Sequence, residues 1–254
     1  MLRVRDVDVF IQASHILRSV SLEVGEREVV CLVGRKGAGK TTTLRTVMGF
    51  HRPHAGSVEL KGRPIHGRRT HEIARLGLGW APEDGAIFPD LTVAENIEIA
   101  TWTRRAGRPA AARIELAYRV FPVLRGYAAR KGPEMSGGER KMLSIARALA
   151  LDPEILLLDE PFEGLSPAII PAVSDGIREI TQLGHAILIA ESNIHHVPAW
   201  TSRLYVIERG EIVFAGTPEA ARHDARLLRI IGGSPSPRIP GGPGTVSTVE
   251  EGEA

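Results

Sequence analysis

The sequence contains 254 residues, of which 43% are apolar and 24% are charged, and its formal net charge is +2. This length is ample for one large α/β domain or for one domain with a subdomain. The nearly balanced charge argues against a basic face for nucleic acid. No stretch approaches the roughly 18 apolar residues of a membrane span, and the first residues alternate like a strand and lack the apolar run of a signal peptide. The single cysteine, Cys31, is expected to be a small buried hydrophobe in a reducing cytoplasm.

The strongest motif follows a short apolar run, residues 28–33, which is typical of a fully buried strand. Residues 34–41 match the phosphate-binding pattern G-x-x-x-x-G-K-[ST], and residues 42–48 read as a helix. Glycines let backbone N–H groups close around phosphate oxygens. Lys40 would reach the β- and γ-phosphates, Thr41 would offer its hydroxyl to Mg²⁺, and the helix N-terminus adds partial positive charge. The predicted phosphate-binding residues are Gly34, Arg35, Lys36, Gly37, Ala38, Gly39, Lys40, Thr41 and Thr42.

Around this motif the chain alternates between strand-like and helical segments. Residues 2–33 carry three strand-like runs, and residues 56–60 read as a further strand. From about residue 90 to about residue 151 helical patterning dominates, beginning at a capping box within residues 92–95 and interrupted by the linker 107–109.

Inside the helical region, Met135 and Ser136 precede two glycines, Gly137 and Gly138, at the start of an amphipathic helix. Ser136 and Glu139 form a capping box, so a simple helix cap is one interpretation. Glycines directly after a cap weaken a helix. They favour a second interpretation, in which a phosphate approaches the helix start closely.

A second site element is the apolar run 155–158 followed by Asp159 and Glu160. A buried strand of this kind delivers its carboxylates at the C-terminal end, where open α/β sheets bind ligands. Asp159 would hold Mg²⁺ through its water shell, and Glu160 would polarise an attacking water as general base. The alternative is a strand that simply ends in two solvated acids. Further strand patterns, separated by helices, predict a mainly parallel sheet; they lie at residues 186–190, 203–207 and 211–214.

The phosphate loop, the Ser-Gly-Gly-Glu signature and the apolar strand with Asp-Glu occur in an order that resembles the nucleotide-binding subunits of ABC transporters. The resemblance covers residues 2 to about 231. It implies an α/β phosphate-loop NTPase core with a mainly parallel sheet, an N-terminal antiparallel β part and a helical subdomain at about residues 90–150. The nucleotide-binding domain would occupy residues 1–231. Residues 232–254, rich in Pro and Gly, are predicted to form a disordered or loosely attached tail.

This resemblance also implies an ATPase that uses ATP and Mg²⁺. Two such domains would form a head-to-tail dimer with two ATPs between them. The phosphate loop of one subunit would face Ser136, Gly137 and Gly138 of the other. Glu160 matches the catalytic glutamate of the family, and residues 163–167 fall at the loop that crosses the dimer interface.

Residues 80–96 narrow the resemblance to the group that takes up branched-chain amino acids and amides. Glu83 stands where many ABC subunits have glutamine, and its carboxylate can still meet Mg²⁺ or its water. The implied partners are integral-membrane permease subunits, a second ATP-binding subunit that is a copy or a paralogue, and indirectly a substrate-binding protein. The implied location is the cytoplasmic face of the cell membrane, reached through the permease.

Three positions depart from the family pattern. Ile11 occupies the place of the aromatic residue that stacks on adenine, and the adjacent Phe10 could substitute for it only if the loop shifts by one residue. Lys36 replaces a small polar residue, so its charge either lies near the phosphates or points to solvent. Ser192 replaces a switch histidine and is a candidate catalytic residue. His195 and His196 are predicted on a helix surface rather than as its replacements.

Other functional classes stay open at this point. One is a soluble ABC ATPase outside transport, such as a ribosome-associated factor or a cluster-assembly scaffold. Another is a regulatory subunit that hardly hydrolyses ATP; the intact Lys40 and Glu160 argue against it, whereas Ser192 keeps it open. Within transport, the runner-up is the motor subunit of a lipid or lipopolysaccharide exporter.

Overall fold

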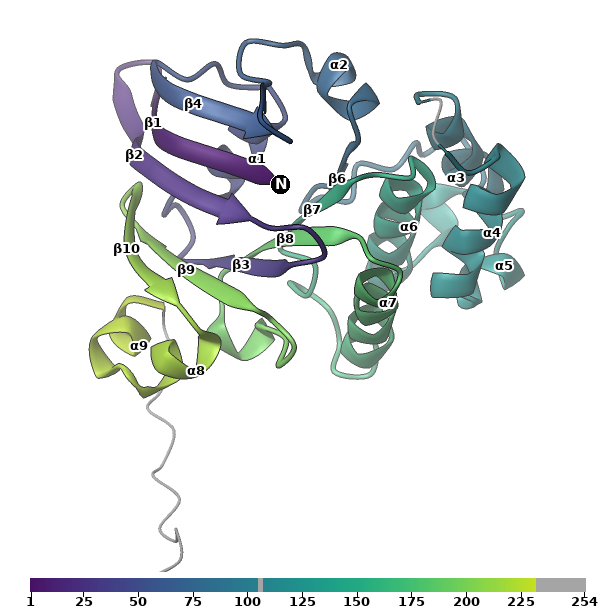
Figure 1. The fold of residues 1–254 in the computed structure, drawn as a ribbon. Coiled ribbons are helices and arrows are strands. Elements are labelled where there is room, and N and C mark those ends of the chain that lie inside the picture. Colours follow the sequence, from purple (N-terminus) through teal and green to yellow (C-terminus); the bar gives the residue numbers. More distant parts are fainter. Residues whose placement is uncertain (105–106, 232–254) are drawn as a thin grey trace, which may run out of the picture.

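The computed structural model describes residues 1–104 and 107–231 and contains two β-sheets with helices packed around them (Figure 1). The predicted tail, residues 232–254, lies outside the described residues. The first sheet is antiparallel and has the strand order β2-β1-β4-β5. Its strands are β1 (Leu2–Ile11), β2 (Ser14–Val24), β4 (Ala55–Leu60) and β5 (Arg63–Pro64).

The second sheet has six strands in the order β10-β9-β3-β8-β7-β6. All its neighbouring pairs are parallel except β9 and β10, which form an antiparallel hairpin. The predicted α/β fold, with a mainly parallel sheet beside an antiparallel part, is therefore confirmed. The strands are β3 (Val29–Val33), β6 (Leu78–Ala81), β7 (Ile155–Asp159), β8 (Ala186–Glu191), β9 (Arg203–Glu208) and β10 (Glu211–Gly216).

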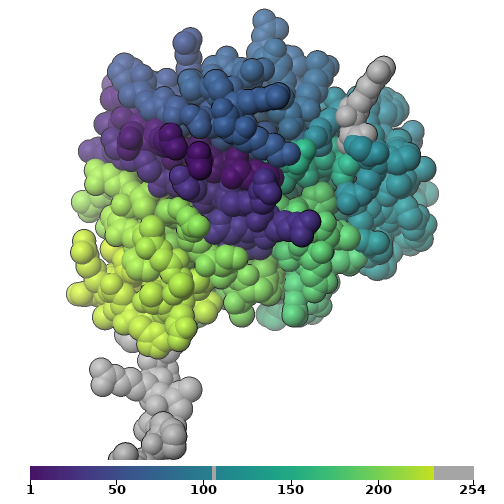
Figure 2. Space-filling model, in the orientation of Figure 1, coloured from purple at the N-terminus to yellow at the C-terminus, as the bar shows by residue number. Residues whose placement is uncertain are grey.

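The helical segments differ in where they pack. Helices α3, α4 and α5 lie together beside the sheets, with α6 between them and the six-stranded sheet (Figure 1). Figure 2 shows the last described residues, coloured yellow-green, on the other side of the molecule from this helical part, which is coloured teal. The helical segments are α1 (Lys40–Val47), α2 (Thr70–Arg75), α3 (Val93–Thr101), α4 (Ala110–Val120), α5 (Val123–Gly126), η1 (Gly132–Glu134), α6 (Gly137–Ala150), α7 (Ile170–Gln182), η2 (Ile194–His196), α8 (Pro218–His223) and α9 (Ala225–Ile231).

Strand β3 is apolar throughout because both of its faces are buried. Val29, Cys31 and Val33 face a core that contains residues of α3, α4, α6 and α7, whereas Val30 and Leu32 face a second core with α1 and the antiparallel sheet. Since side chains alternate across a strand, a strand covered on both faces has no polar position. Cys31 is fully buried, as predicted, and burial raises the pKa of its thiol to about 12, so it stays a neutral thiol in the folded protein.

Both predicted capping boxes are present. The Thr92 side chain accepts a hydrogen bond from Glu95 N at the start of α3, and Ser136 accepts one from Glu139 N at the start of α6. In turn, the N–H groups of the two cap residues donate hydrogen bonds to the carboxylates of Glu95 and Glu139. Among the described helices, none is long and apolar enough to cross a membrane.

Candidate nucleotide-binding and hydrolysis site

The phosphate loop joins the C-terminal end of β3 to the N-terminus of α1, and two of its glycines are required by its geometry. A Cβ atom at Gly34 would come within 2.3 Å of the Ile207 carbonyl oxygen. Gly39 has φ = 116°, a left-handed value that side chains rarely adopt, and a Cβ there would press on Leu17. These contacts explain why the turn needs glycine before any ligand is considered.

Lys40 lies inside the loop and is only 4% exposed. Its ammonium group donates to the Gly34 carbonyl at 2.7 Å, to the Arg35 carbonyl at 3.2 Å and to Ser192 Oγ at 3.0 Å. Its Nζ also lies 3.1 Å from Glu160 Oε1. The structure therefore brings the lysine predicted to bind phosphate into contact with the glutamate predicted to act as base.

Asp159 ends β7 and is 1% exposed. Its Oδ1 accepts a hydrogen bond from the Thr41 hydroxyl at 3.1 Å, and its Oδ2 is buried without a partner among the described residues. Burial is the main cause that raises the pKa of this carboxyl to about 6, and the Thr41 hydrogen bond opposes the shift. An unpaired buried carboxylate oxygen beside a hydroxyl is the donor set that a hard cation such as Mg²⁺ prefers.

These residues fit a metal that shares its coordination sphere with other oxygens. The described residues contain no group of three or more His, Cys, Asp or Glu side chains that could hold an ion by themselves. Mg²⁺ commonly uses one or two carboxylates together with water and phosphate oxygens. Thr41 and Asp159 are the described residues that could hold such an ion.

Glu160 follows β7 directly and combines burial with an unusual backbone. It is 3% exposed and has φ = 48°, in the left-handed region that is unfavourable for residues other than glycine. Its N–H donates to the Ala190 carbonyl at 2.9 Å, and its Oε2 accepts from Ser192 N at 2.9 Å. Ser192 Oγ also donates to Glu160 Oε1. The carboxylate is thus fixed by the end of the neighbouring strand, β8, and strained backbone of this kind clusters at functional sites.

The region around Ser192 corrects one expectation. His195 is exposed, as predicted, but His196 is half-buried, and its Nδ1 lies 3.3 Å from Glu191 Oε2. The predicted helix is only the short 3₁₀ turn η2, which places His196 against the Phe162 ring instead of on an open surface. Ser192 itself lies between the side chains of Lys40 and Glu160.

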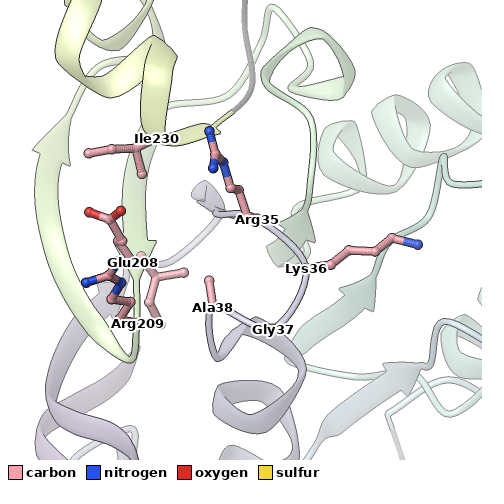
Figure 3. Close-up of a pocket in the computed structure, with 8 residues that line it drawn as sticks. Arg35, Lys36, Gly37, Ala38, Glu208, Arg209 and Ile230 are labelled. Atoms are coloured by element: carbon pink, nitrogen blue, oxygen red, sulfur yellow. The ribbon is translucent and has the colours of Figure 1, made fainter.

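The two charged side chains at the start of the loop point away from each other (Figure 3). Lys36 is exposed and forms an ion pair with Glu163. The sequence had left open whether its charge lies near the phosphates or points to solvent; in the structure the charge is at the surface but is paired with a carboxylate. Arg35 donates to the Arg229 carbonyl of α9. Beside them, a cavity of about 210 Å³ is lined by the loop, by Ile207 to Arg209 and by Ile230.

The Ser-Gly-Gly signature does not meet the phosphate loop of its own chain. Ser136 and Gly137 are exposed at the start of α6. Gly137 and Glu83 instead line a shared cavity of about 190 Å³. In the part of the chain that the structure describes, no hydrogen bond joins residues 136–138 to residues 34–42.

The structure shows the exposure and the contacts of Glu83 and Phe10, which the sequence did not predict. Glu83 is exposed, and its carbonyl accepts a hydrogen bond from the buried Lys141 at 2.6 Å. Phe10 is 47% exposed, and its ring stacks on His15 with a centroid distance of 4.2 Å and an interplanar angle of 10°. One face of the Phe10 ring is therefore already covered.

Sequence reasoning missed the buried residues Glu191 and Lys141. Neither residue was assigned a role from the sequence. The available signal was the position of Glu191, a lone acid that follows five apolar residues of β8 directly before Ser192.

Comparison with known proteins gives consistent results. The sequence profile of the family described as "ABC transporter" matches residues 17–163. The lipopolysaccharide export system ATP-binding protein of Acidithiobacillus ferridurans is 35% identical over 217 residues, covering 85% of this chain and 89% of that protein. The probable branched-chain amino acid transport ATP-binding protein of Archaeoglobus fulgidus is 34% identical over 218 residues, covering 85% and 92%. In fold, the chain is similar to the ADP conformation of an ATP-binding cassette of an ABC transporter, with a TM-score of 0.78, 23% identity and coverage of 92% and 99%.

Proposed function

The chain belongs to the ABC transporter family, and from that premise we propose how its site works and what it serves. It is an ATP-binding and ATP-hydrolysing subunit of a transporter. Residues 34–42 would bind the phosphates of ATP, with Lys40 at the β- and γ-phosphates, and Glu160 would act as the general base.

The observation that carries this assignment is the convergence of three strand ends. The phosphate loop follows β3, Asp159 and Glu160 close β7, and Ser192 follows β8, which lies between the other two strands in the sheet. The Glu160 carboxylate lies 3.1 Å from Lys40 Nζ, and the Ser192 hydroxyl, which is 152 residues further along the chain than Lys40, lies 3.0 Å from it. If residues 34–41 were only a glycine-rich surface turn with a solvated lysine, Lys40 would not be buried against a carboxylate.

Magnesium would be held by the Thr41 hydroxyl and by Asp159, with Glu83 reaching it directly or through water. The buried, unpaired Asp159 Oδ2 supports this assignment. The chemistry that Mg²⁺ would supply at these two residues is neutralisation of phosphate charge during phosphoryl transfer. The protein's own residues do the rest: the loop orients the phosphates, and Lys40 offsets their charge.

Glu160 would take a proton from the attacking water. Its carboxylate is fixed by Ser192 N and Oγ, and such positioning is worth more in phosphoryl transfer than intrinsic basicity. Because Ser192 also accepts from Lys40, the serine would join the two catalytic groups into one network. Phe10 remains the candidate for contact with adenine: its ring is 47% exposed, although it stacks on His15 and has a T-shaped contact with the His54 ring.

A second ATP-binding subunit would complete the site. Ser136 and Gly137 are exposed, and among the described residues the signature 136–138 forms no hydrogen bond with its own phosphate loop, which supports a role opposite the loop of another chain. We also infer that the pair docks on a permease at the cytoplasmic face of the membrane. Sedimentation with Mg-ATP and co-purification with candidate permeases would test these two steps separately.

For the cargo, we propose branched-chain amino acids or related amides, taken up with the help of a substrate-binding protein. The support is the resemblance of residues 80–96 to that group and the relatives assigned to branched-chain amino acid transport at 34% and 33% identity. Lipopolysaccharide export is the second candidate, since relatives with that assignment are 35% identical.

The test is reconstitution. The chain would be co-assembled with permeases encoded beside its gene, and ATP-driven uptake of labelled leucine into proteoliposomes would be measured. Uptake that requires both ATP and a binding protein supports the proposal. ATPase stimulation by lipopolysaccharide without leucine uptake would assign the chain to export instead.

A further inference from the structure

Glu191 is the last residue of β8 and is completely buried. It sits one residue before Ser192, whose N–H and hydroxyl hold the Glu160 carboxylate. An acid buried at 0% exposure needs partners, because an unpaired buried charge is strongly unfavourable. One of its partners belongs to the loop that follows the proposed general base, and the other belongs to the turn η2.

The side chain of Glu191 bridges two segments. Its Oε1 accepts a hydrogen bond from Phe162 N at 3.2 Å, two residues after Glu160. Its Oε2 lies 3.3 Å from His196 Nδ1, and the His196 ring packs edge-on against the ring of Phe162 with a centroid distance of 6.2 Å. Glu191 therefore fixes the turn at Phe162 from two sides.

The backbone of the same short segment completes the attachment. Glu160 N donates to the Ala190 carbonyl at 2.9 Å, and Gly34 N donates to the Glu191 carbonyl at 3.2 Å. Residues 190–192 thus contact both ends of the 160–162 turn and the first residue of the phosphate loop. A shift of this turn would move the Glu160 carboxylate relative to Lys40.

Burial and the neighbouring carboxylates favour the neutral form of Glu191, whereas the charge of Lys141 opposes it. Besides His196, it faces the carboxylates of Glu160 and Glu163 and the ammonium group of Lys141. The pKa of the Glu191 carboxyl is raised to about 8, mainly by burial and next by the charge of Glu160. A neutral carboxyl can still accept the Phe162 N–H bond through its carbonyl oxygen and can donate its proton to the His196 ring.

We propose that Glu191 is a positioning residue for ATP hydrolysis: by holding the Phe162 N–H, it aims the Glu160 carboxylate at the attacking water. This inference rests on the proposed role of Glu160 as general base. The chemical requirement at position 191 is a buried hydrogen-bond acceptor of glutamate length, not a negative charge. Glutamine should therefore replace it, whereas an apolar residue of similar size should not.

The experiment compares Glu191→Leu with Glu191→Gln in the purified full-length chain, with His195→Ala as a control at an exposed neighbour. Steady-state ATPase assays give kcat and KM, and binding of a fluorescent ATP analogue measures affinity separately. We expect Glu191→Leu to lower kcat by about 10- to 100-fold, since a small misplacement of a catalytic group has effects of that order. KM and affinity should change by less than about twofold, because the phosphate loop is untouched. Glu191→Gln and His195→Ala should keep kcat within about threefold of wild type.

Two results would overturn the inference. One is a folded Glu191→Leu variant with wild-type kcat, and the other is an equal loss of kcat in the leucine and glutamine variants. If the leucine variant does not fold, the exchange rate of the Phe162 amide hydrogen is measured instead. Slow exchange is expected in wild type and in Glu191→Gln. Fast exchange in wild type would refute the hydrogen bond between Phe162 and Glu191. A wild-type chain that hydrolyses no Mg-ATP would instead refute the proposed function, while the exchange measurement would still report on the Phe162 contact.

Discussion

The phosphate loop, residues 34–42, and the carboxylate cluster of Asp159, Glu160 and Glu191 lie at the same edge of the six-stranded sheet, but they are built differently. The loop is one continuous segment closed by its own backbone. The cluster comes from two strands, β7 and β8, joined by hydrogen bonds between side chains and loops. The comparison teaches that a phosphate-binding loop can be specified by one short segment of sequence. The orientation of a catalytic side chain depends instead on which strands are neighbours in the sheet.

The largest expected effect concerns the cluster. Glu160→Gln should lower kcat by about 10²- to 10⁴-fold, because it removes the general base, while Mg-ATP binding to the loop is retained. The variant should then accumulate as an ATP-loaded dimer in sedimentation experiments. Adding Ser136→Arg, which fills the approach to the signature, should abolish that association. A variant that stays monomeric with ATP, even beside a paralogous subunit, would contradict the sandwich arrangement.

The matching change in the loop is Lys40→Ala. It should weaken ATP binding by roughly 10- to 100-fold, the value of a charge-assisted hydrogen bond, measured by isothermal titration. Equal affinity in the variant and wild type would refute the assignment of the loop. Because Lys40 also faces Glu160 inside the protein, the melting temperature of the variant must be checked as a control.

Ser192 joins the two regions, so its replacement should have an intermediate effect. Ser192→Ala removes the hydroxyl between Lys40 and Glu160 and should lower kcat by about 10-fold, the value of one hydrogen bond, with little change in ATP affinity. Ser192→His tests whether the residue usual in the family raises turnover, alone and in the assembled transporter. If neither substitution alters the rate, position 192 has no catalytic role.

The cluster also makes a prediction about pH and stability. The pKa of Glu191 is raised from 4.5 to about 8, so the folded state binds its proton more tightly than the unfolded state. The stabilisation is complete below about pH 4.5 and is lost as pH rises to about 8. Glu191→Gln cannot ionise, so its melting temperature should fall less over this range than that of wild type. If the melting temperatures of the two proteins change equally with pH, ionisation of Glu191 is not the cause of the pH dependence.

The smallest effect is expected on the rim of the loop. Lys36→Gln breaks the ion pair with Glu163, but the lysine is exposed, and exposed pairs contribute little. The melting temperature should be unchanged, and ATP affinity should change by less than about twofold, a difference that salt should remove. A much larger loss of affinity would mean that Lys36 contacts the nucleotide.

Much of the fold and part of the site could be predicted from the sequence. The phosphate loop, the capping boxes at Thr92 and Ser136, and the mainly parallel sheet all depend on local patterns, and the structure has them. Glu191 and the inward-facing His196 could not be predicted, because their roles depend on the pairing of β7 with β8 and on contacts with Phe162, which lies 29 residues before Glu191 and 34 before His196.

The left-handed backbone of Glu160 has an evolutionary consequence. A residue other than glycine in this region costs about 1–3 kcal/mol, and glycine or asparagine adopts it more readily. Only a need for a carboxylate at this point opposes their substitution. Paralogues that have ceased to hydrolyse ATP are therefore expected to drift toward glycine or asparagine at this position, which makes residue 160 a marker for separating active motors from silent copies.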